Sequence, residues 1–406
     1  MLVFNQAAST GKPLAEFASL LGPEAPGLVR SYPSLVAHPS ATPLHRLNAL
    51  AQSLDIGRIY AKDEGFRLGL GSFKALGGAY AVARLVQEWA EKEWGRRVPA
   101  HELLDPAVRA IVARQTCTCA TDGNHGRSVA AGAQAFGCKA VIFVPQRVSI
   151  ERLEAIRKFG AEIVVVPGNY DDSVAECRRV AAERGWQIVS DTSWPGYETI
   201  PGYVMQGYTV MVDECLSSLE ADGVRLTHIF VQAGVGGLAA AVGGHVTLRY
   251  GANAPRIVAV EPDRANCLLH SAVMGTPIRI RQGQPTIMSM LECYEPSLVA
   301  WQILEQTAYA FMDVPDEAAI EAMRRLARPL GSDPAIVAGE SGSAGVAGLM
   351  EACTGHKLLQ SVGLQKDSMV LVFISEGATA PRRYRELVGL DPEAVLGGKS
   401  QTGGRP

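Results

Sequence analysis

Residues 116–168 read TCTCATDGNHGRSVAAGAQAFGCKAVIFVPQRVSIERLEAIRKFGAEIVVVPG, and this stretch decides the class of fold. Short β-branched runs alternate in it with amphipathic stretches of helical period. The alternation continues to residue 193 with DDSVAECRRVAAERG and WQIVSDTS. Runs that are apolar throughout, such as 141–144 and 164–166, are typical of parallel strands covered by helices on both faces. The region therefore predicts an α/β unit built on a parallel sheet.

The same alternation returns after residue 226 and predicts a second α/β sheet. It runs through THIFVQAG, LAAAVGGHVTLRYG, PRIVAVEP and, much later, SMVLVFISEG. We expect a larger domain of residues 1–72 and 200–395, a smaller domain of residues 73–199, and a disordered tail at 396–406. Each domain would hold a mostly parallel, twisted sheet flanked by helices. Ligands of such folds bind beyond the carboxyl ends of the strands, so the cleft between the sheets is the expected site.

The composition excludes several classes of partner. A chain of 406 residues is long enough for two or three domains. Its formal net charge of -3 leaves no basic excess of the kind that nucleic-acid binding needs. No signal-peptide pattern opens the chain, and no apolar run reaches the roughly 18 residues of a membrane span. We therefore expect a cytoplasmic protein with neither a nucleic-acid nor a membrane partner.

Eight cysteines are scattered along the chain without metal-ligand spacing, so we expect no metal site. Residues 262–300 follow neither the helical nor the strand period and are predicted to be irregular near the cleft. Cys267 and Cys293 bracket much of this stretch. Two reduced thiols are the favoured state in a cytoplasmic chain, and a bridge between them is the alternative.

Lys74 is the first candidate for chemistry. It lies in GSFKALGGAYAVARL, between Phe73 and a run of small apolar residues that is too apolar for a solvent-facing helix. A lysine at the start of a helix is usually a solvated charge. In these surroundings we expect it to be desolvated, which makes its amine nucleophilic enough to form a Schiff base.

Two glycine-containing loops follow predicted strands. Asn124, in DGNHG, either caps the helix that begins there or donates a hydrogen bond to a cofactor oxygen. The second loop precedes a helix, whose N-terminal amides form an anion site. The residues of this second loop are Gly234, Val235, Gly236, Gly237 and Leu238. We expect a bulky side chain at residue 236 to block a phosphate from these amides.

The second loop also fits another function. Gly234, Gly236 and Ala239 satisfy the dinucleotide fingerprint, and Glu261 ends the next strand where a ribose-binding acid would lie. A nicotinamide-dependent oxidoreductase is therefore an alternative, but it leaves Lys74 and the DGNHG loop without a role.

FKALGGA, DGNHG, AGVGGL and SEGAT, in this order, resemble the pyridoxal-phosphate (PLP) dependent lyases and synthases of the tryptophan-synthase-β-like class. The resemblance spans residues 60–385. It implies PLP bound through a Schiff base on Lys74, with Asn124 at the pyridine hydroxyl and residues 234–238 at the phosphate. It further implies Ser375 at the pyridine nitrogen, with Thr379 close behind, and a homodimer, since the class tends to dimerise.

Two acidic residues point to one member of this class. Serine and threonine dehydratases normally have a small residue before Gly-Asn-His, whereas this chain has Asp122. Asp191 follows another predicted strand and opens DTSWPGYETIPGY. In isolation, Asp122 reads as a helix cap and Asp191 as the start of an Asp-Thr-Ser turn. A buried carboxylate is costly unless it is paired or used, however, so a role at the cofactor is the alternative.

With EPDRANCLLHSA, PTIMSMLECYEPS and GESGSAG, these motifs resemble the diaminopropionate ammonia-lyase family. The resemblance implies α,β-elimination of 2,3-diaminopropionate to pyruvate and two molecules of ammonia. Lys74 would take the Cα proton of the L-isomer and Asp122 that of the D-isomer. Asp191 would bind the small amino-acid substrate through its second ammonium. A serine or threonine dehydratase of the same fold is the alternative.

Overall fold

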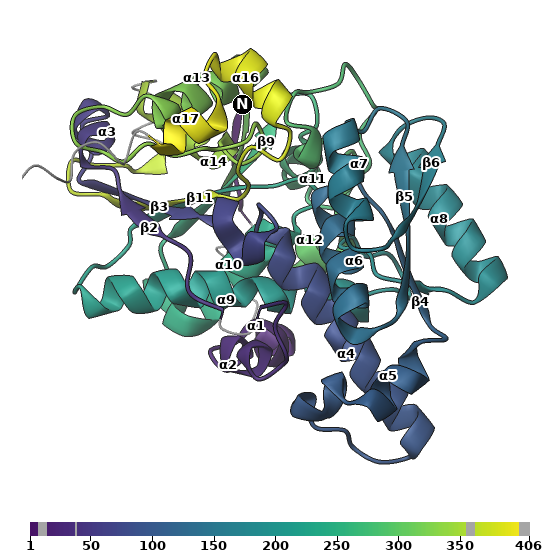
Figure 1. Cartoon of the computed structure of the whole chain (residues 1–406). Coiled ribbons are helices and arrows are strands. Elements are labelled where there is room, and N and C mark those ends of the chain that lie inside the picture. Colours follow the sequence, from purple (N-terminus) through teal and green to yellow (C-terminus); the bar gives the residue numbers. More distant parts are fainter. Residues whose placement is uncertain (7–13, 37–38, 355–361, 398–406) are drawn as a thin grey trace, which may run out of the picture.

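The computed structural model describes residues 1–6, 14–36, 39–354 and 362–397. Two separate sheets organise these residues, a larger one and a smaller one that lie side by side in Figure 1. All strands of the smaller sheet fall within residues 73–199, and all strands of the larger one fall outside that range. The predicted fold class is confirmed, whereas the domain boundaries themselves stay a prediction.

The smaller sheet has four strands, all parallel. Their order is β6 (Glu162–Val166), β5 (Lys139–Pro145), β4 (Thr116–Ala120) and β7 (Gln187–Ile188). The helices beside it are α6 (Asn124–Phe136), α7 (Ile150–Arg157) and α8 (Tyr170–Arg184). These elements follow the alternation predicted from the sequence. Burial on both faces was wrong for β6, because it is an edge strand in which Val165 is 49% exposed.

The larger sheet has seven strands, of which the five central ones are parallel. Their order is β1 (Leu2–Phe4), β10 (Ala308–Val314), β9 (Arg256–Pro262), β8 (His228–Gln232), β11 (Met369–Ile374), β3 (Arg58–Asp63) and β2 (Leu44–Arg46). The two edge strands, β1 and β2, pair antiparallel with their neighbours. The sequence patterns indicated β8, β9 and β11 but missed the others.

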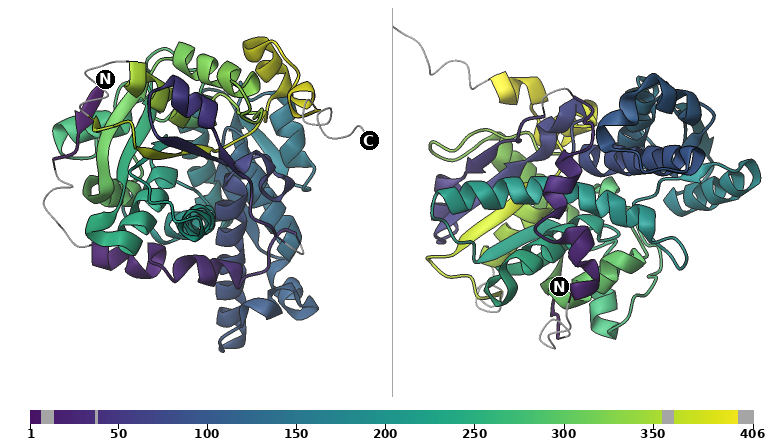
Figure 2. Two further views of the ribbon diagram at one scale, coloured as in Figure 1. Left: turned by 90° about the vertical axis from the view of Figure 1, so that its left-hand side faces the viewer. Right: turned by 90° about the horizontal axis from the view of Figure 1, so that it is seen from below.

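Both faces of the larger sheet are covered, as Figures 1 and 2 show. Alternate side chains of each strand enter two different cores: Ile229 packs in one and Phe230 in the other. The first core includes α9 (Thr199–Ala221), α10 (Gly237–Tyr250) and α12 (Leu298–Thr307). The second includes α3 (Asn48–Ser53), α13 (Asp316–Ala327) and α14 (Ala344–Thr354). Alternation with period two places the central strands of this sheet between two apolar layers, whereas the edge strands β1 and β2 are only partly buried.

Helix α4 (Lys74–Trp94) lies close against α9, and glycines allow this contact. A Cβ at Gly77 would lie 2.5 Å from the Tyr208 ring, and one at Gly207 would lie 2.7 Å from the Leu76 carbonyl. Distances this short leave no room for a side chain. The close approach of the two helices fixes the position of Lys74 at the start of α4.

Part of the stretch predicted to be irregular is helical, because it contains α11 (Cys267–Met274), a 3-10 helix at Ser289–Leu291 and the first residues of α12. The buried Glu261 carboxylate accepts hydrogen bonds from the amides of Leu268 and Leu269, at 2.8 and 2.7 Å. Glu261 therefore stabilises the start of α11. Irregular backbone occupies residues 276–288.

Cys267 and Cys293 are both free thiols, so the suggested bridge between them is not formed. Within the described residues, no helix is long and apolar enough to cross a membrane. The described side chains also contain no group of three or more His, Cys, Asp and Glu residues arranged to hold a metal. Residues 398–406 of the predicted tail lie outside the described residues, and Leu396 and Gly397 belong to α17 (Pro392–Gly397).

Candidate active site

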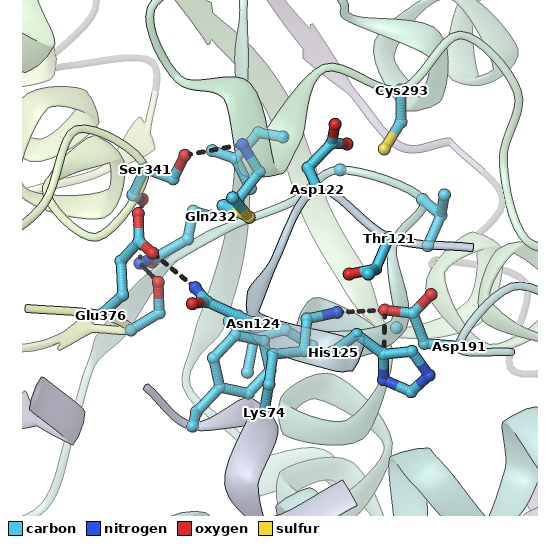
Figure 3. A pocket seen from close by; sticks show the side chains of 18 of the residues that line it. Lys74, Thr121, Asp122, Asn124, His125, Asp191, Gln232, Cys293, Ser341 and Glu376 are labelled. Atoms are coloured by element: carbon cyan, nitrogen blue, oxygen red, sulfur yellow. Dashed lines mark hydrogen bonds and ion pairs between the residues drawn. The ribbon is translucent and has the colours of Figure 1, made fainter. Parts of the chain in front are cut away.

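One pocket lies where strands of both sheets end, and Figure 3 shows it from close by. Segments that follow β4, β7, β8 and β11 line it, together with the first residue of α4. The predicted site residues found there are Lys74, Asp122, Asn124, Asp191, Gly234, Val235, Gly236, Gly237, Leu238 and Ser375. Thr379 is the exception, because it does not line the pocket. Its hydroxyl donates to Glu376 Oε2 at 3.2 Å.

Lys74 is held by a charge partner that is distant in the sequence. Its Nζ donates to a carboxylate oxygen of Asp191. The ammonium also lies 5.2 Å from the ring centroid of Phe73 and 6.0 Å from that of Tyr208, positions that favour a cation. Burial opposes the charge on Lys74, but Asp191 outweighs burial and raises the pKa of the amine above its usual range. Lys74 is therefore not a solvated charge: it is desolvated, as expected, and Asp191 holds it in its charged form.

Asp191 and His125 complete this side of the pocket. Burial works against an ionised Asp191, yet Lys74 and then His125 hold the pKa of its carboxyl well below the usual range. His125 Nε2 lies 2.7 Å from the Val189 carbonyl, which fixes a proton on that nitrogen. Burial lowers the pKa of His125, and its Nδ1 lies 3.9 Å from Asp191 without a hydrogen-bond partner. Asp191 is thus an ion-pair partner rather than a turn residue.

Asp122 enters the same cavity and makes no hydrogen bond to any described residue. The interpretation of Asp122 as a helix cap is wrong, because α6 has Gly123 at its N-cap position with a φ of 144°. The amides of Gly123 and Gly126 instead donate to the hydroxyl of Thr121, at 3.0 and 3.2 Å. Burial raises the pKa of Asp122 to about 7, although Arg152 opposes the shift.

A second group of polar side chains lies across the pocket from Asp191 (Figure 3). Asn124 Nδ2 donates to Glu376 Oε2 at 2.5 Å, so its side chain does not cap the helix. Ser375 Oγ accepts a hydrogen bond of 2.6 Å from Gln232 Nε2. The sequence analysis missed Gln232, Glu376 and His125, although each lies in or next to a quoted motif.

The glycine loop leads from β8 into α10. Gly236 has a φ of 102°, which is left-handed backbone, and Gly237 is the first residue of the helix. The first amides of a helix have no acceptor within the helix, so this loop presents donors to the pocket. Glu261, the acid that would bind the ribose of a dinucleotide, instead accepts hydrogen bonds from the first turn of α11. This removes the basis of the nicotinamide alternative.

The direction of a side chain at residue 236 differs from the one expected, whereas its effect on PLP binding stays a prediction. A Cβ there would lie 3.1 Å from Leu304 Cδ1 and 3.2 Å from Ala300 Cβ, which belong to the apolar core. We therefore expect Gly236→Ala to lower the free energy of unfolding by about 1–3 kcal/mol, because it combines left-handed backbone with a close contact. Gly237→Ala is the matched control, since its Cβ would meet only ordinary contacts at 3.7 Å or more. Urea denaturation of both variants measures the difference; equal stabilities would contradict the expectation.

The residues of the pocket fit PLP. The loop amides suit a phosphate, Ser375 and Asn124 suit the polar atoms of a pyridine ring, and Lys74 is an amine for a carbonyl carbon. Three residues that line the pocket have a buried side-chain atom without a hydrogen-bond partner: Gln232 Oε1, Glu376 Oε1 and His125 Nδ1. Such atoms are costly unless a ligand or water satisfies them.

Two α/β sheets with a lysine and a glycine loop facing one cleft define a PLP-dependent enzyme of the tryptophan-synthase-β-like fold. A family model described as "Pyridoxal-phosphate dependent enzyme" matches residues 36–376. The diaminopropionate ammonia-lyase of Escherichia coli (strain K12) is 39% identical over 372 residues, which are 91% of this chain and 92% of that protein. The chain belongs to the diaminopropionate ammonia-lyase family of PLP-dependent enzymes.

A solved structure agrees with this assignment. The crystal structure of the E. coli diaminopropionate ammonia-lyase in complex with D-serine superposes with a TM-score of 0.87, at 36% identity and 96% coverage of both chains. The L-threonine dehydratase of Haemophilus influenzae is more distant, at 26% identity over 76% of this chain and 52% of that protein.

Proposed function

We propose that this chain converts 2,3-diaminopropionate and water into pyruvate and two molecules of ammonia, with PLP as its cofactor. The observation that carries the proposal is the presence of two carboxylates, Asp122 and Asp191, in one pocket with Lys74. A substrate with a second ammonium on Cβ suits two acids, whereas the hydroxyl of serine or threonine needs neither. Membership of the ammonia-lyase family supports the same substrate.

Different residues of the chain would bind different parts of the cofactor. The amides of the loop at residues 234–238 would hold the phosphate, Ser375 the pyridine nitrogen and Asn124 the pyridine hydroxyl. Lys74 would hold the carbonyl carbon of the cofactor through its amine. When bound there, PLP supplies an electron sink for the pair left at Cα after its proton is removed.

Lys74 and Asp122 are the two proton acceptors. Once released, Lys74 Nζ takes the Cα proton of the L-isomer, and Asp191 beside it accepts a hydrogen bond from the ammonium that results. The carboxylate raises the pKa of Lys74, which makes the free amine a stronger base. Asp122 lies on a different side of the cavity in Figure 3 and takes the Cα proton of the D-isomer.

Asp191 also binds the substrate. Its carboxylate remains ionised beside Lys74 and His125, so it holds the Cβ ammonium that leaves as ammonia. The remaining three-carbon fragment takes up water and releases the second ammonia with pyruvate.

Asp191→Asn is expected to lower the activity on both isomers by about 10²-fold, because either proton transfer needs the substrate ammonium in place. The asparagine has a similar shape but no charge. The kcat/KM values for pyruvate formation from D- and L-diaminopropionate measure the effect. Loss on one isomer alone would contradict a binding role and assign Asp191 to one proton transfer.

The substrate itself is tested by comparing pyruvate formation from L- and D-diaminopropionate with that from L- and D-serine. We expect diaminopropionate to have the higher kcat/KM. A preference for serine would contradict the proposal and favour a dehydratase.

We further propose that the enzyme is a homodimer in the cytoplasm. The tendency of its class to dimerise supports the first point, and the patterns of its sequence support the second. Sedimentation equilibrium of the purified protein tests the dimer, and a mass equal to that of one chain would contradict it.

A further inference from the structure

Glu376 is a buried carboxyl to which the proposed reaction assigns no task. It follows Ser375 at the end of β11, is 2% exposed and lines the pocket. Isolated buried carboxylates are costly, so each one requires an explanation in terms of its partners.

The backbone on either side of Glu376 is attached to the segment that precedes Lys74. Ser72 and Glu376 form an isolated antiparallel bridge. The Phe73 amide donates to the Ser375 carbonyl at 2.9 Å, and the Gly377 amide donates to the Gly71 carbonyl at 3.0 Å. These contacts hold Glu376 in a fixed place relative to the start of α4.

The side chain of Glu376 reaches a residue of the other sheet. Its Oε2 accepts hydrogen bonds from Asn124 Nδ2 and Thr379 Oγ1, whereas Oε1 is buried without a partner. Asn124 is 252 positions away in the sequence and begins α6 beside the smaller sheet. The Glu376 carboxyl therefore connects Asn124, the predicted cofactor contact beside the smaller sheet, with the end of β11 in the larger sheet.

This contact decides which way the amide of Asn124 points. A primary amide carries two N–H donors on one side and a carbonyl acceptor on the other. Because Glu376 Oε2 is an acceptor, the amide nitrogen of Asn124 faces it. If the amide were flipped, its oxygen would face the carboxylate oxygen, and both atoms are acceptors. The second N–H of the same nitrogen is then left to donate to another acceptor.

We propose that Glu376 is a positioning residue that orients the Asn124 amide so that an N–H group is presented to the oxygen of the bound cofactor ring. The inference rests on the proposed PLP-dependent function, because it names what holds one cofactor contact in place. Burial and Glu340 raise the pKa of Glu376 to about 7, while the opposing effects come from Arg152 and from its two hydrogen-bond donors.

Three substitutions of Glu376 test the length of its side chain and its charge separately. Glu376→Gln keeps the length and an acceptor oxygen but loses the charge. Glu376→Asp keeps the charge but withdraws it by one methylene, and Glu376→Met keeps the bulk with no oxygen. We expect the Asp and Met variants to bind PLP about 10-fold more weakly, because the Asn124 amide loses the acceptor that orients it, and the Gln variant, which keeps that acceptor, to stay close to the wild type.

Two readouts are measured on each purified full-length variant: the dissociation constant of PLP and the absorption band of the bound cofactor, which reports on its ring oxygen. Far-UV circular dichroism of the PLP-free protein shows whether each variant is folded. The same Asp substitution in an Asn124→Ala background should produce no further loss. A Gln variant as weak as the Asp variant, wild-type binding in the Asp variant, or an undiminished loss in the Asn124→Ala background would each overturn the inference. Failure of the unmodified chain to bind PLP or form pyruvate would instead refute the proposed function.

Discussion

Lys74→Ala is expected to remove all measurable pyruvate formation and to leave PLP loosely bound. The variant lacks both the covalent attachment of the cofactor and the base for the L-isomer. It also leaves Asp191 without its ion-pair partner, which changes the charge of the pocket. Gel filtration followed by absorbance measures whether PLP remains on the protein, and a pyruvate assay measures turnover.

Lys92→Ala is the matched control for this experiment. Lys92 lies on the same helix, α4, but is exposed near its C-terminal end. Removing it should change neither PLP retention nor turnover. Retention of PLP with normal turnover in Lys74→Ala would show that another residue carries the cofactor.

Asp122→Asn is expected to lower the activity on D-diaminopropionate by about 10²- to 10⁴-fold, the usual effect of removing a general base. A measurable fraction of the activity on the L-isomer should remain, because Lys74 still takes that proton. The kcat/KM values for the two isomers, measured on one preparation, give the comparison. Equal losses on both would mean that Asp122 binds substrate or supports the structure, and the two-base mechanism would be wrong.

The pH dependence provides a second measurement of the same residue. Burial raises the pKa of Asp122 to about 7, against the effect of Arg152, with Glu292, Arg147 and Asp191 as the other charged neighbours. A carboxyl accepts a proton only when ionised, so the kcat/KM of the wild type for the D-isomer should fall as the pH drops below about 7. The residual activity of Asp122→Asn on this isomer should lack that acid limb. A D-isomer profile that is flat through this range in the wild type would contradict the assignment.

Local patterns were sufficient for much of the fold. Apolar runs of β-branched residues identified seven strands, β4 to β9 and β11, because parallel strands between two helical layers are apolar on both faces. The longer strands β3 and β10 were also not identified from the sequence. The short strands β1 and β2 were missed because three residues carry too little periodicity to be recognised.

The order of the motifs was also sufficient to place the candidate site, since residues that follow parallel strands meet at one edge. The role of a side chain could not be predicted from the sequence where that role depends on which partner the side chain contacts. Thr121, rather than Asp122, accepts the amides at the start of α6, although the two are adjacent. A Cβ at residue 236 points to the apolar core, a direction that the sequence does not state.

The sequence by itself therefore determined the two α/β sheets, the glycine loop and, among the polar residues after the strands, Asp122, Asn124, Asp191 and Ser375. Only the tertiary structure decided how those residues are charged and held. Lys74 and Asp191 are 117 positions apart, and Asn124 and Glu376 are 252 positions apart. Periodicity reflects burial over a few neighbouring residues, whereas the pKa of a group depends on every charge near it in space and on its distance from water. That is why the elevated pKa values of Lys74 and Asp122 follow from the folded chain alone.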